Sequence, residues 1–195
     1  MVSSAAFAPR VSATNEREGD CRVFMKVKQL ATEFNLWQKI ENSVAELLPR
    51  RAVAGFLAEI ALIPIQKSRA TRRLGAYVSL GKEPICIRLQ FAQEPDNLRQ
   101  TFLHEVAHAC DHLSRKGRRQ EYRQAHGESW KMWAQALGVS TSTSAESEAV
   151  RQLHQQRLKL IGVCEKCGAG FHRVRRLNRT RTYTHEQCGG KIRQL

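Results

Sequence analysis

FLHEVAHACDH, residues 102–112, is the most informative segment of this sequence for the fold. Its apolar residues recur at three- and four-residue steps, which predicts a buried α-helix. Within it, His104 and His108 stand four positions apart, so both imidazoles lie on the same helix face. A chance match on a solvated helix is the alternative, but Val106 and Ala107 between the histidines are apolar. Imidazoles on a buried helix need partners, and a metal ion would supply one.

Glu105 completes an HExxH pentapeptide, the pattern of zinc sites in which the glutamate is the catalytic base. Zn²⁺ lowers the pKa of a bound water toward neutrality, and an adjacent carboxylate can take its proton. A catalytic zinc site needs a third protein ligand. The metzincin spacing does not provide it, because Asp111 and Ser114 occupy its glycine and last histidine positions. His112 is too far from His104 to share one ion, since eight residues span about 12 Å of helix.

Four residues therefore remain candidates for the third ligand: His126, Asp111, Glu121 and Glu128. Seventeen residues separate His108 from His126, which is enough for the helix to end and the chain to return. Gly127 follows His126 and permits a tight turn or a close backbone approach.

Around this helix the sequence predicts further helices and short strands. Pro95-Asp96-Asn97 predicts the start of the central helix over 98–113, with Asp96 or Asn97 as N-cap. Periodicity and turn signals predict the other elements. These are helices over 30–48, 52–61 and 127–138, and strands over 60–66, 74–80 and 85–91.

A second cluster of metal-ligand residues lies near the C-terminus. Cys164 and Cys167 form a CxxC knuckle, and His185 and Cys188 form an HxxC knuckle after 17 intervening residues. This spacing is typical of a zinc ribbon with four N/S ligands, which makes the metal structural. His172 is a rival to His185, and a disulfide is the alternative for the first knuckle.

The chain is strongly basic, with a formal net charge of +14. Residues 151–195 hold 11 Lys and Arg against two Glu. Such clustering favours a polyanionic partner, so we expect nucleic-acid contact. No apolar stretch typical of a secretory signal stands at the N-terminus, and the apolar run 52–65 is too short for a membrane span. We therefore expect a cytoplasmic protein, associated with the nucleoid in a bacterium or nuclear in a eukaryote, without membrane association.

Three segments together resemble the SprT-like family of zincin metalloproteases, to which the DNA-dependent protease Spartan belongs. They are FLHEVAHACDH, HGESWKMW at 126–133 and the terminal cluster, and the segments 72–80 and 85–89 resemble the family's hairpin. The resemblance implies His104, His108 and His126 as ligands of a catalytic zinc, with Glu105 as base and Trp130 at the aromatic position. One departure is His185, where family ribbons more often have cysteine.

We therefore expect an α+β, zincin-like metalloprotease domain, with helices on a small antiparallel sheet, followed by a zinc ribbon. The expected boundaries are a mobile segment at 1–25, the protease domain at 26–138, a connector at 139–160 and the ribbon at 161–195. The expected activity is zinc-dependent peptide hydrolysis of proteins on DNA, either single-stranded or in DNA–protein complexes. Two alternatives stay open: a nucleic-acid-binding zinc protein with little hydrolysis, and a peptidase that never touches nucleic acid.

Overall fold

The computed structural model describes residues 24–81, 83–115, 125–140 and 146–195. The predicted mobile segment 1–25 lies almost wholly outside these ranges, as do Glu121 and most of the basic run 115–123. The elements in the described ranges, in chain order, are β1 (Met25–Lys26), α1 (Val27–Glu33), α2 (Trp37–Leu47), α3 (Arg50–Leu62), β2 (Pro64–Lys67), β3 (Gly75–Leu80), β4 (Glu83–Leu89), α4 (Pro95–Ser114), α5 (Glu128–Ala136), α6 (Glu148–Gln156), β5 (Lys159–Cys164), β6 (Gly170–Arg173) and β7 (Ile192–Gln194).

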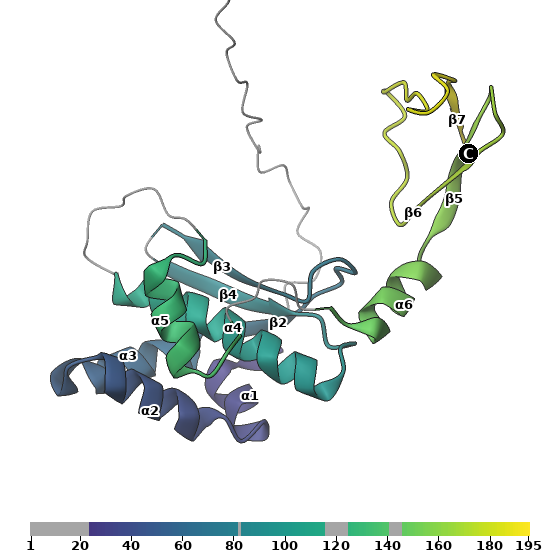
Figure 1. Ribbon diagram of the computed structural model, residues 1–195. Helices are drawn as coiled ribbons and strands as arrows, with labels where there is room; N and C mark the ends of the chain where they lie inside the picture. The colour runs from purple at the N-terminus through teal and green to yellow at the C-terminus, as the bar shows by residue number, and fades with distance from the viewer. Residues whose placement is uncertain (1–23, 82, 116–124, 141–145) are drawn as a thin grey trace, which may run out of the picture.

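A four-stranded sheet in the order β1-β2-β4-β3 carries α1–α5 on one face (Figure 1). The α+β class is confirmed. The sheet is mixed, however, and not wholly antiparallel as we expected, because β2 and β4 pair in parallel. The reason is the chain path: after β2 the chain returns along β3 at the edge, and β4 then inserts between them. This order leaves β3 as the edge strand nearest α4.

Helix α4 is the centre of the core and packs on β3, β4 and α5. Its apolar face is buried as the periodicity predicted. On α5, Trp133 is buried and stacks on Phe56 of α3, with ring centroids 5.5 Å apart. The predicted N-cap differs: Glu94 is the cap and Pro95 is the first helical residue, a position that suits the fixed φ of proline.

Two predicted elements near the N-terminus differ from the structure. The single helix over 30–48 is divided into α1 and α2, because Asn35 adopts a φ of +58° that interrupts the helix. The strand predicted over 60–66 begins only at Pro64, since residues up to Leu62 continue α3. Proline at residue 64 is compatible with the start of a strand but not with the interior of a helix.

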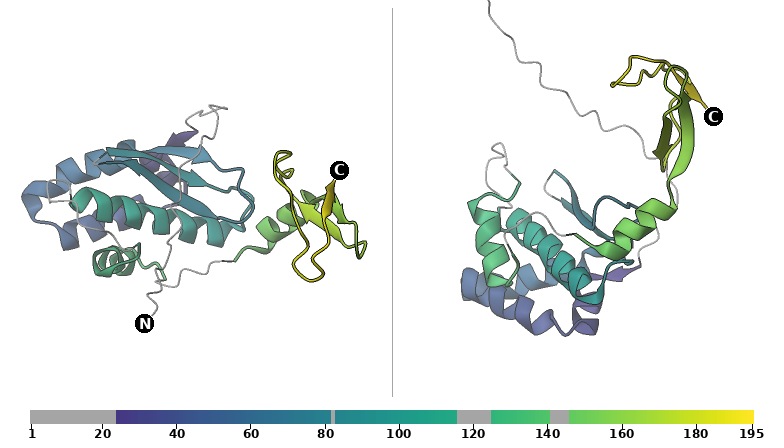
Figure 2. Two further views of the ribbon diagram at one scale, coloured as in Figure 1. Left: turned by 90° about the horizontal axis from the view of Figure 1, so that it is seen from above. Right: turned by 45° about the vertical axis from the view of Figure 1, so that its right-hand side comes forward.

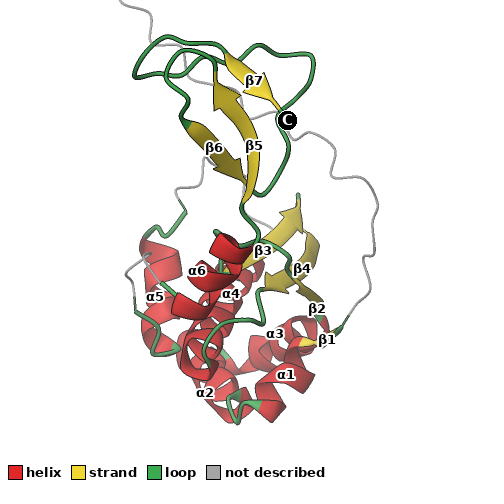
Figure 3. Ribbon diagram, turned by 90° about the vertical axis from the view of Figure 1, so that its right-hand side faces the viewer, coloured by secondary structure: helices red, strands yellow, loops and turns green. Residues whose placement is uncertain are grey.

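After α5 the chain reaches α6, which lies inside the predicted connector. The N-terminus of α6 is fixed to the central helix, since the Ala149 amide donates to Glu94 over 2.9 Å. Near the C-terminal end of α6, Arg157 donates to the carbonyl of Arg69 over 2.9 Å. A separate three-stranded sheet in the order β6-β5-β7 follows beyond α6 (Figures 2 and 3). Among the described helices, none combines the length and hydrophobicity that crossing a bilayer requires.

Candidate metal centres and catalytic cleft

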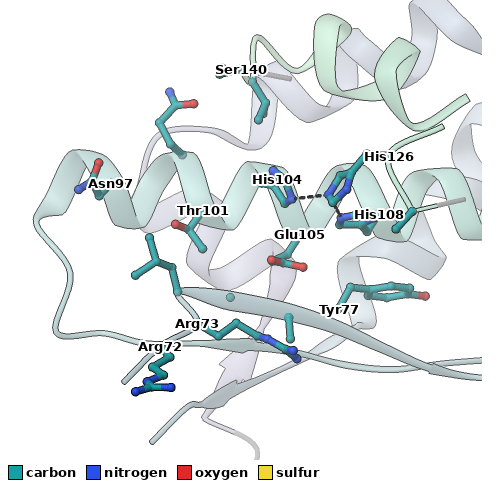
Figure 4. Close-up of a pocket in the computed structure, with 16 residues that line it drawn as sticks. Arg72, Arg73, Tyr77, Asn97, Thr101, His104, Glu105, His108, His126 and Ser140 are labelled. Atoms are coloured by element: carbon teal, nitrogen blue, oxygen red, sulfur yellow. Dashed lines mark hydrogen bonds between the residues drawn. The ribbon is translucent and has the colours of Figure 1, made fainter. Parts of the chain in front are cut away.

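Three imidazoles converge on one point above α4 (Figure 4). The Nε2 atom of His126 lies 3.1 Å from that of His108 and 3.2 Å from that of His104. His104 and His108 come from successive turns of α4, and His126 immediately precedes α5. The structure thus brings together the three histidines that the resemblance implied.

Local backbone conformation and one aromatic ring hold His126 in place. His126 has a φ of +64°, an uncommon conformation outside glycine, and Gly127 then caps α5. One turn into α5, the buried Trp130 contacts all three imidazoles, with centroid distances of 4.8 Å to His104, 5.2 Å to His108 and 4.4 Å to His126. The tight turn and the indole ring therefore fix the third histidine against the first two.

The three nitrogens fit a divalent metal of the size of zinc. Zinc–nitrogen bonds of about 2.0–2.1 Å in a tetrahedron place neighbouring nitrogens about 3.3 Å apart. Burial lowers the pKa of His104 to about 4 and that of His108 to about 3, and it also lowers the pKa of His126. The imidazoles are therefore neutral at physiological pH, which is the form that binds metal.

The rival third ligands within the described residues lie elsewhere. Asp111 pairs with Arg115 over 2.8 Å, and the exposed Glu128 pairs with Lys131 over 2.7 Å. His112 is buried but belongs to a different network, in which its Nδ1 lies 2.6 Å from the Tyr77 hydroxyl. Among the residues that the structure describes, the candidate metal group on this side of the molecule consists of the three histidines.

Glu105 lies beside this cluster, between α4 and β3, and its side chain is buried (Figure 4). Burial raises its pKa to about 7, although a hydrogen bond from the Tyr77 backbone and the charge of Arg73 act in the opposite direction. A carboxyl group in this position can exchange a proton with a molecule bound at the histidine cluster.

A cleft of about 930 Å³ opens over the histidines and Glu105. Its walls include Thr101 on α4, Gly75 and Tyr77 on β3, and Arg73 just before β3. These wall residues belong to no motif that the sequence analysis singled out. Gly75 carried a usable signal, because a glycine inside a strand pattern often marks a close backbone approach.

The terminal cysteines and His185 form a second convergent group. Cys188 Sγ lies 3.5 Å from both Cys164 Sγ and Cys167 Sγ, and His185 Nδ1 lies 3.2 Å from Cys167 Sγ and from Cys188 Sγ. These separations are close to the edges of a tetrahedral zinc site, about 3.6–3.8 Å for bonds of 2.3 Å to sulfur and 2.0–2.1 Å to nitrogen. The rival His172 is exposed on β6 and does not join the group.

Glycines shape both knuckles of this group. Gly168 and Gly189 have φ values of +74° and +68°, and a Cβ on Gly190 would lie 2.6 Å from Cys164 Sγ. The backbone amide of Cys167 is the main cause that lowers the pKa of Cys164 to about 6. Zinc binds cysteine as the thiolate, and four converging N/S ligands fill a tetrahedral shell, so the group fits a closed, structural metal site.

Comparison with known protein families gives one match. The sequence model of the SprT-like family matches residues 44–151, which is more than half of the chain. The match includes α4, His126 and α5 and ends before the cysteine cluster, which is consistent with a zinc ribbon added after the family domain. No curated protein and no solved structure matched the chain. On the strength of the family match, the chain belongs to the SprT-like family.

Proposed function

We propose that this protein is a zinc-dependent metallopeptidase that hydrolyses peptide bonds. The observation that carries this proposal is the convergence of three neutral imidazoles beside a buried carboxylate, in a cleft of a SprT-like chain. His104, His108 and His126 would hold the catalytic zinc, and the Cys/His cluster would hold a structural one. In this reading, residues 26–138 form the peptidase domain, 139–160 the connector and 161–195 the ribbon.

When bound, the zinc would act as a Lewis acid toward the scissile carbonyl and would acidify the attacking water. Glu105 takes the proton of that water while the new C–O bond forms. The same carboxyl group then passes the proton to the nitrogen of the leaving amine as the C–N bond breaks. Burial between α4 and β3 keeps the carboxyl group at the cleft and limits exchange with bulk water.

We further propose that the substrates are proteins bound to DNA. The support is the basic C-terminal module, where a hollow of about 520 Å³ is lined by five cationic side chains. These are Arg176, Arg179, Arg181, Lys191 and Arg193. A concave cationic surface suits the phosphates of a nucleic acid, whose binding releases counterions. A binding module alone would not need Glu105, which is why hydrolysis is the leading proposal.

Cleavage of casein and of histones, with and without single-stranded DNA, tests this function directly. We expect zinc-dependent cleavage that DNA stimulates for histones, and cleavage that is at least about 10²-fold slower in Glu105→Gln. Cleavage that DNA never affects would instead favour a peptidase without a nucleic-acid role. Binding without any cleavage would favour a nucleic-acid-binding zinc protein.

The contact with DNA has its own test. Replacing Arg176, Arg179 and Arg181 by alanine should weaken binding to single-stranded DNA, and should lower the slope of log affinity against log salt by about 2, at about 0.7 per cation. An unchanged slope would refute the assignment of this hollow to phosphates. The exposed cation Lys131, which is paired with Glu128 on α5, provides a control, and Lys131→Ala should leave the slope unchanged.

A further inference from the structure

The edge strand β3 passes unusually close to Glu105. A Cβ atom on Gly75 would lie 2.7 Å from Oε1 of Glu105 and 2.7 Å from Cγ2 of Thr101. Gly75 lies in the strand and does not have the positive φ that other glycines of the chain adopt. Its backbone would therefore accept alanine, and the requirement for glycine is one of space. The strand and the carboxylate approach each other only because no side chain lies between them.

The backbone of the same strand also holds the carboxylate. The Leu74 carbonyl accepts from Gln90 beyond the end of β4, over 2.9 Å. Backbone groups of successive residues alternate in direction along a strand, so those of Gly75 and Tyr77 face away from β4. The Tyr77 amide, which faces away from β4, donates a hydrogen bond to Glu105. An edge amide that would otherwise face the cleft thus fixes the carboxylate.

A first side-chain contact ties the start of β3 to α4. Gln93 is buried and donates to the carbonyl of Leu74 over 3.1 Å, while its own side-chain oxygen accepts from the Thr101 hydroxyl over 2.7 Å. Thr101 lies one helical turn before Glu105 on α4. This contact therefore sets the distance between strand and helix on one side of the carboxylate.

A second contact ties β3 to α4 on the other side of the carboxylate. The ring of the buried His112 lies between the Tyr77 hydroxyl, 2.6 Å from Nδ1, and the Gly81 carbonyl, 3.1 Å from Nε2. Because the carbonyl can only accept, Nε2 carries the proton and Nδ1 accepts from the Tyr77 hydroxyl. His112 thus locks the later part of β3 onto the same helix that carries Glu105.

We propose that the strand segment 74–77 is a preformed template that positions the Glu105 carboxylate. Gly75 makes room for the carboxylate, the Tyr77 amide orients it, and the Gln93–Thr101 and Tyr77–His112 contacts fix the template to α4. Gly75, Tyr77 and His112 are positioning residues in this account, since they act through Glu105. The inference rests on the proposed peptidase function for its kinetic consequences, but the placement of Glu105 can be measured without activity.

The substitution Gly75→Ala tests the template. The added Cβ would lie 2.7 Å from Oε1 of Glu105, so the carboxylate must move by about 0.7 Å to reach an ordinary contact distance of 3.4 Å. A misplacement of about 1 Å can lower a rate by about 10²-fold. We expect kcat to fall by about 10- to 100-fold, with KM and zinc content unchanged. The matched control is Gly55→Ala on α3, where nothing lies within 4 Å of the added Cβ, and kcat should not change.

Tyr77→Phe separates the two roles of its residue, because it keeps the amide donor and removes the hydroxyl that bonds His112. We expect kcat to fall by about fivefold, again with KM unchanged, because one hydrogen bond that fixes the template is lost. A fall in the melting temperature or in zinc content that fully accounts for the lost activity of Gly75→Ala would mean a merely structural role, and would overturn the proposal.

Amide exchange supplies the readout that needs no activity. The chain has three tyrosines, so labelling with ¹⁵N-tyrosine gives a simple spectrum. We expect the Tyr77 amide to be protected from exchange in the wild type, and to lose protection in Glu105→Ala and Gly75→Ala but not in Gly55→Ala. Protection that does not depend on Glu105 would overturn the inference. If the wild type cleaves no protein but the Tyr77 pattern holds, the proposed function fails while the template stands.

Discussion

Replacing Glu105 by glutamine should make the metal-free protein more stable while it removes activity. Glutamine keeps the shape of the side chain and its acceptor for the Tyr77 amide. Burial raises the pKa of Glu105 from 4.5 to about 7, so between these pH values the folded protein holds a proton that the unfolded chain releases. At about 1.4 kcal/mol per pKa unit, this shift lowers the free energy of unfolding at high pH by about 3 kcal/mol.

The sign of this effect fixes its pH dependence. The contribution of the protonated Glu105 to stability is fully present below pH 4.5 and is lost as the pH rises through about 7. Glutamine does not titrate, so the stability of the variant relative to the wild type should increase as the pH rises from 4.5. The full difference in the free energy of unfolding is reached above about pH 7. Removal of the proton acceptor should also lower kcat by about 10²- to 10⁴-fold in the zinc-loaded enzyme.

Urea unfolding of the metal-free proteins, followed by tryptophan fluorescence at pH 4.5, 6 and 8, measures the difference. The three tryptophans all lie in α2 and α5, so the signal reports on the domain that carries Glu105 and not on the ribbon. The control is Glu128→Gln, because Glu128 is exposed and forms an ion pair with the exposed Lys131. Equal stabilities of the wild type and Glu105→Gln at pH 8 would refute the reasoning that burial of the carboxylate is costly.

Substitutions at the ribbon, at Trp130 and at Gly138 test three further predictions. Elemental analysis of His185→Cys should find about two zinc equivalents per chain, because cysteine can replace histidine as a zinc ligand. Cys188→Ser should retain about one equivalent, and two equivalents in that variant would exclude Cys188 as a ligand. Trp130→Phe should lower the free energy of unfolding in urea by at most about 1.5 kcal/mol, since the buried indole nitrogen has no hydrogen-bond partner among the described residues. Trp130→Ala should lower it by about 3–5 kcal/mol, and equal losses in the two variants would contradict this prediction. Gly138→Ala should lower stability by about 1–2 kcal/mol, because Gly138 has a φ of +63°; a thermal melt with no loss would show that this turn relaxes.

The parts that could be predicted from the sequence depend on local spacing. The four-residue step between His104 and His108 fixes both on one helix face, whatever the rest of the chain does. The two terminal knuckles are equally local, since each places two ligands three residues apart. Both groups of side chains converge in the structure. His126 is different: spacing left it among four candidates, and the family resemblance selected it.

The parts that could not be predicted depend on contacts between distant segments. Asn35 interrupts a helix that periodicity alone would continue. The parallel pairing of β2 with β4 follows from strand order, which no single segment encodes. The importance of Gly75 depends on Thr101 and Glu105, which lie on α4 and meet β3 only after folding. The sequence excluded His112 as a ligand of the same ion but did not indicate its partners, because Tyr77 and Gly81 also come from the hairpin.

Titration of the metal-free protein with zinc, with casein cleavage and tryptophan fluorescence recorded on the same samples, shows whether the three histidines hold the catalytic metal. Trp130 contacts all three histidines, so binding at this cluster should change the fluorescence. We predict that cleavage increases in parallel with the fluorescence change and reaches its maximum at about two equivalents of zinc per chain. A fluorescence change without any cleavage, or cleavage that survives His126→Ala at full rate, would contradict it.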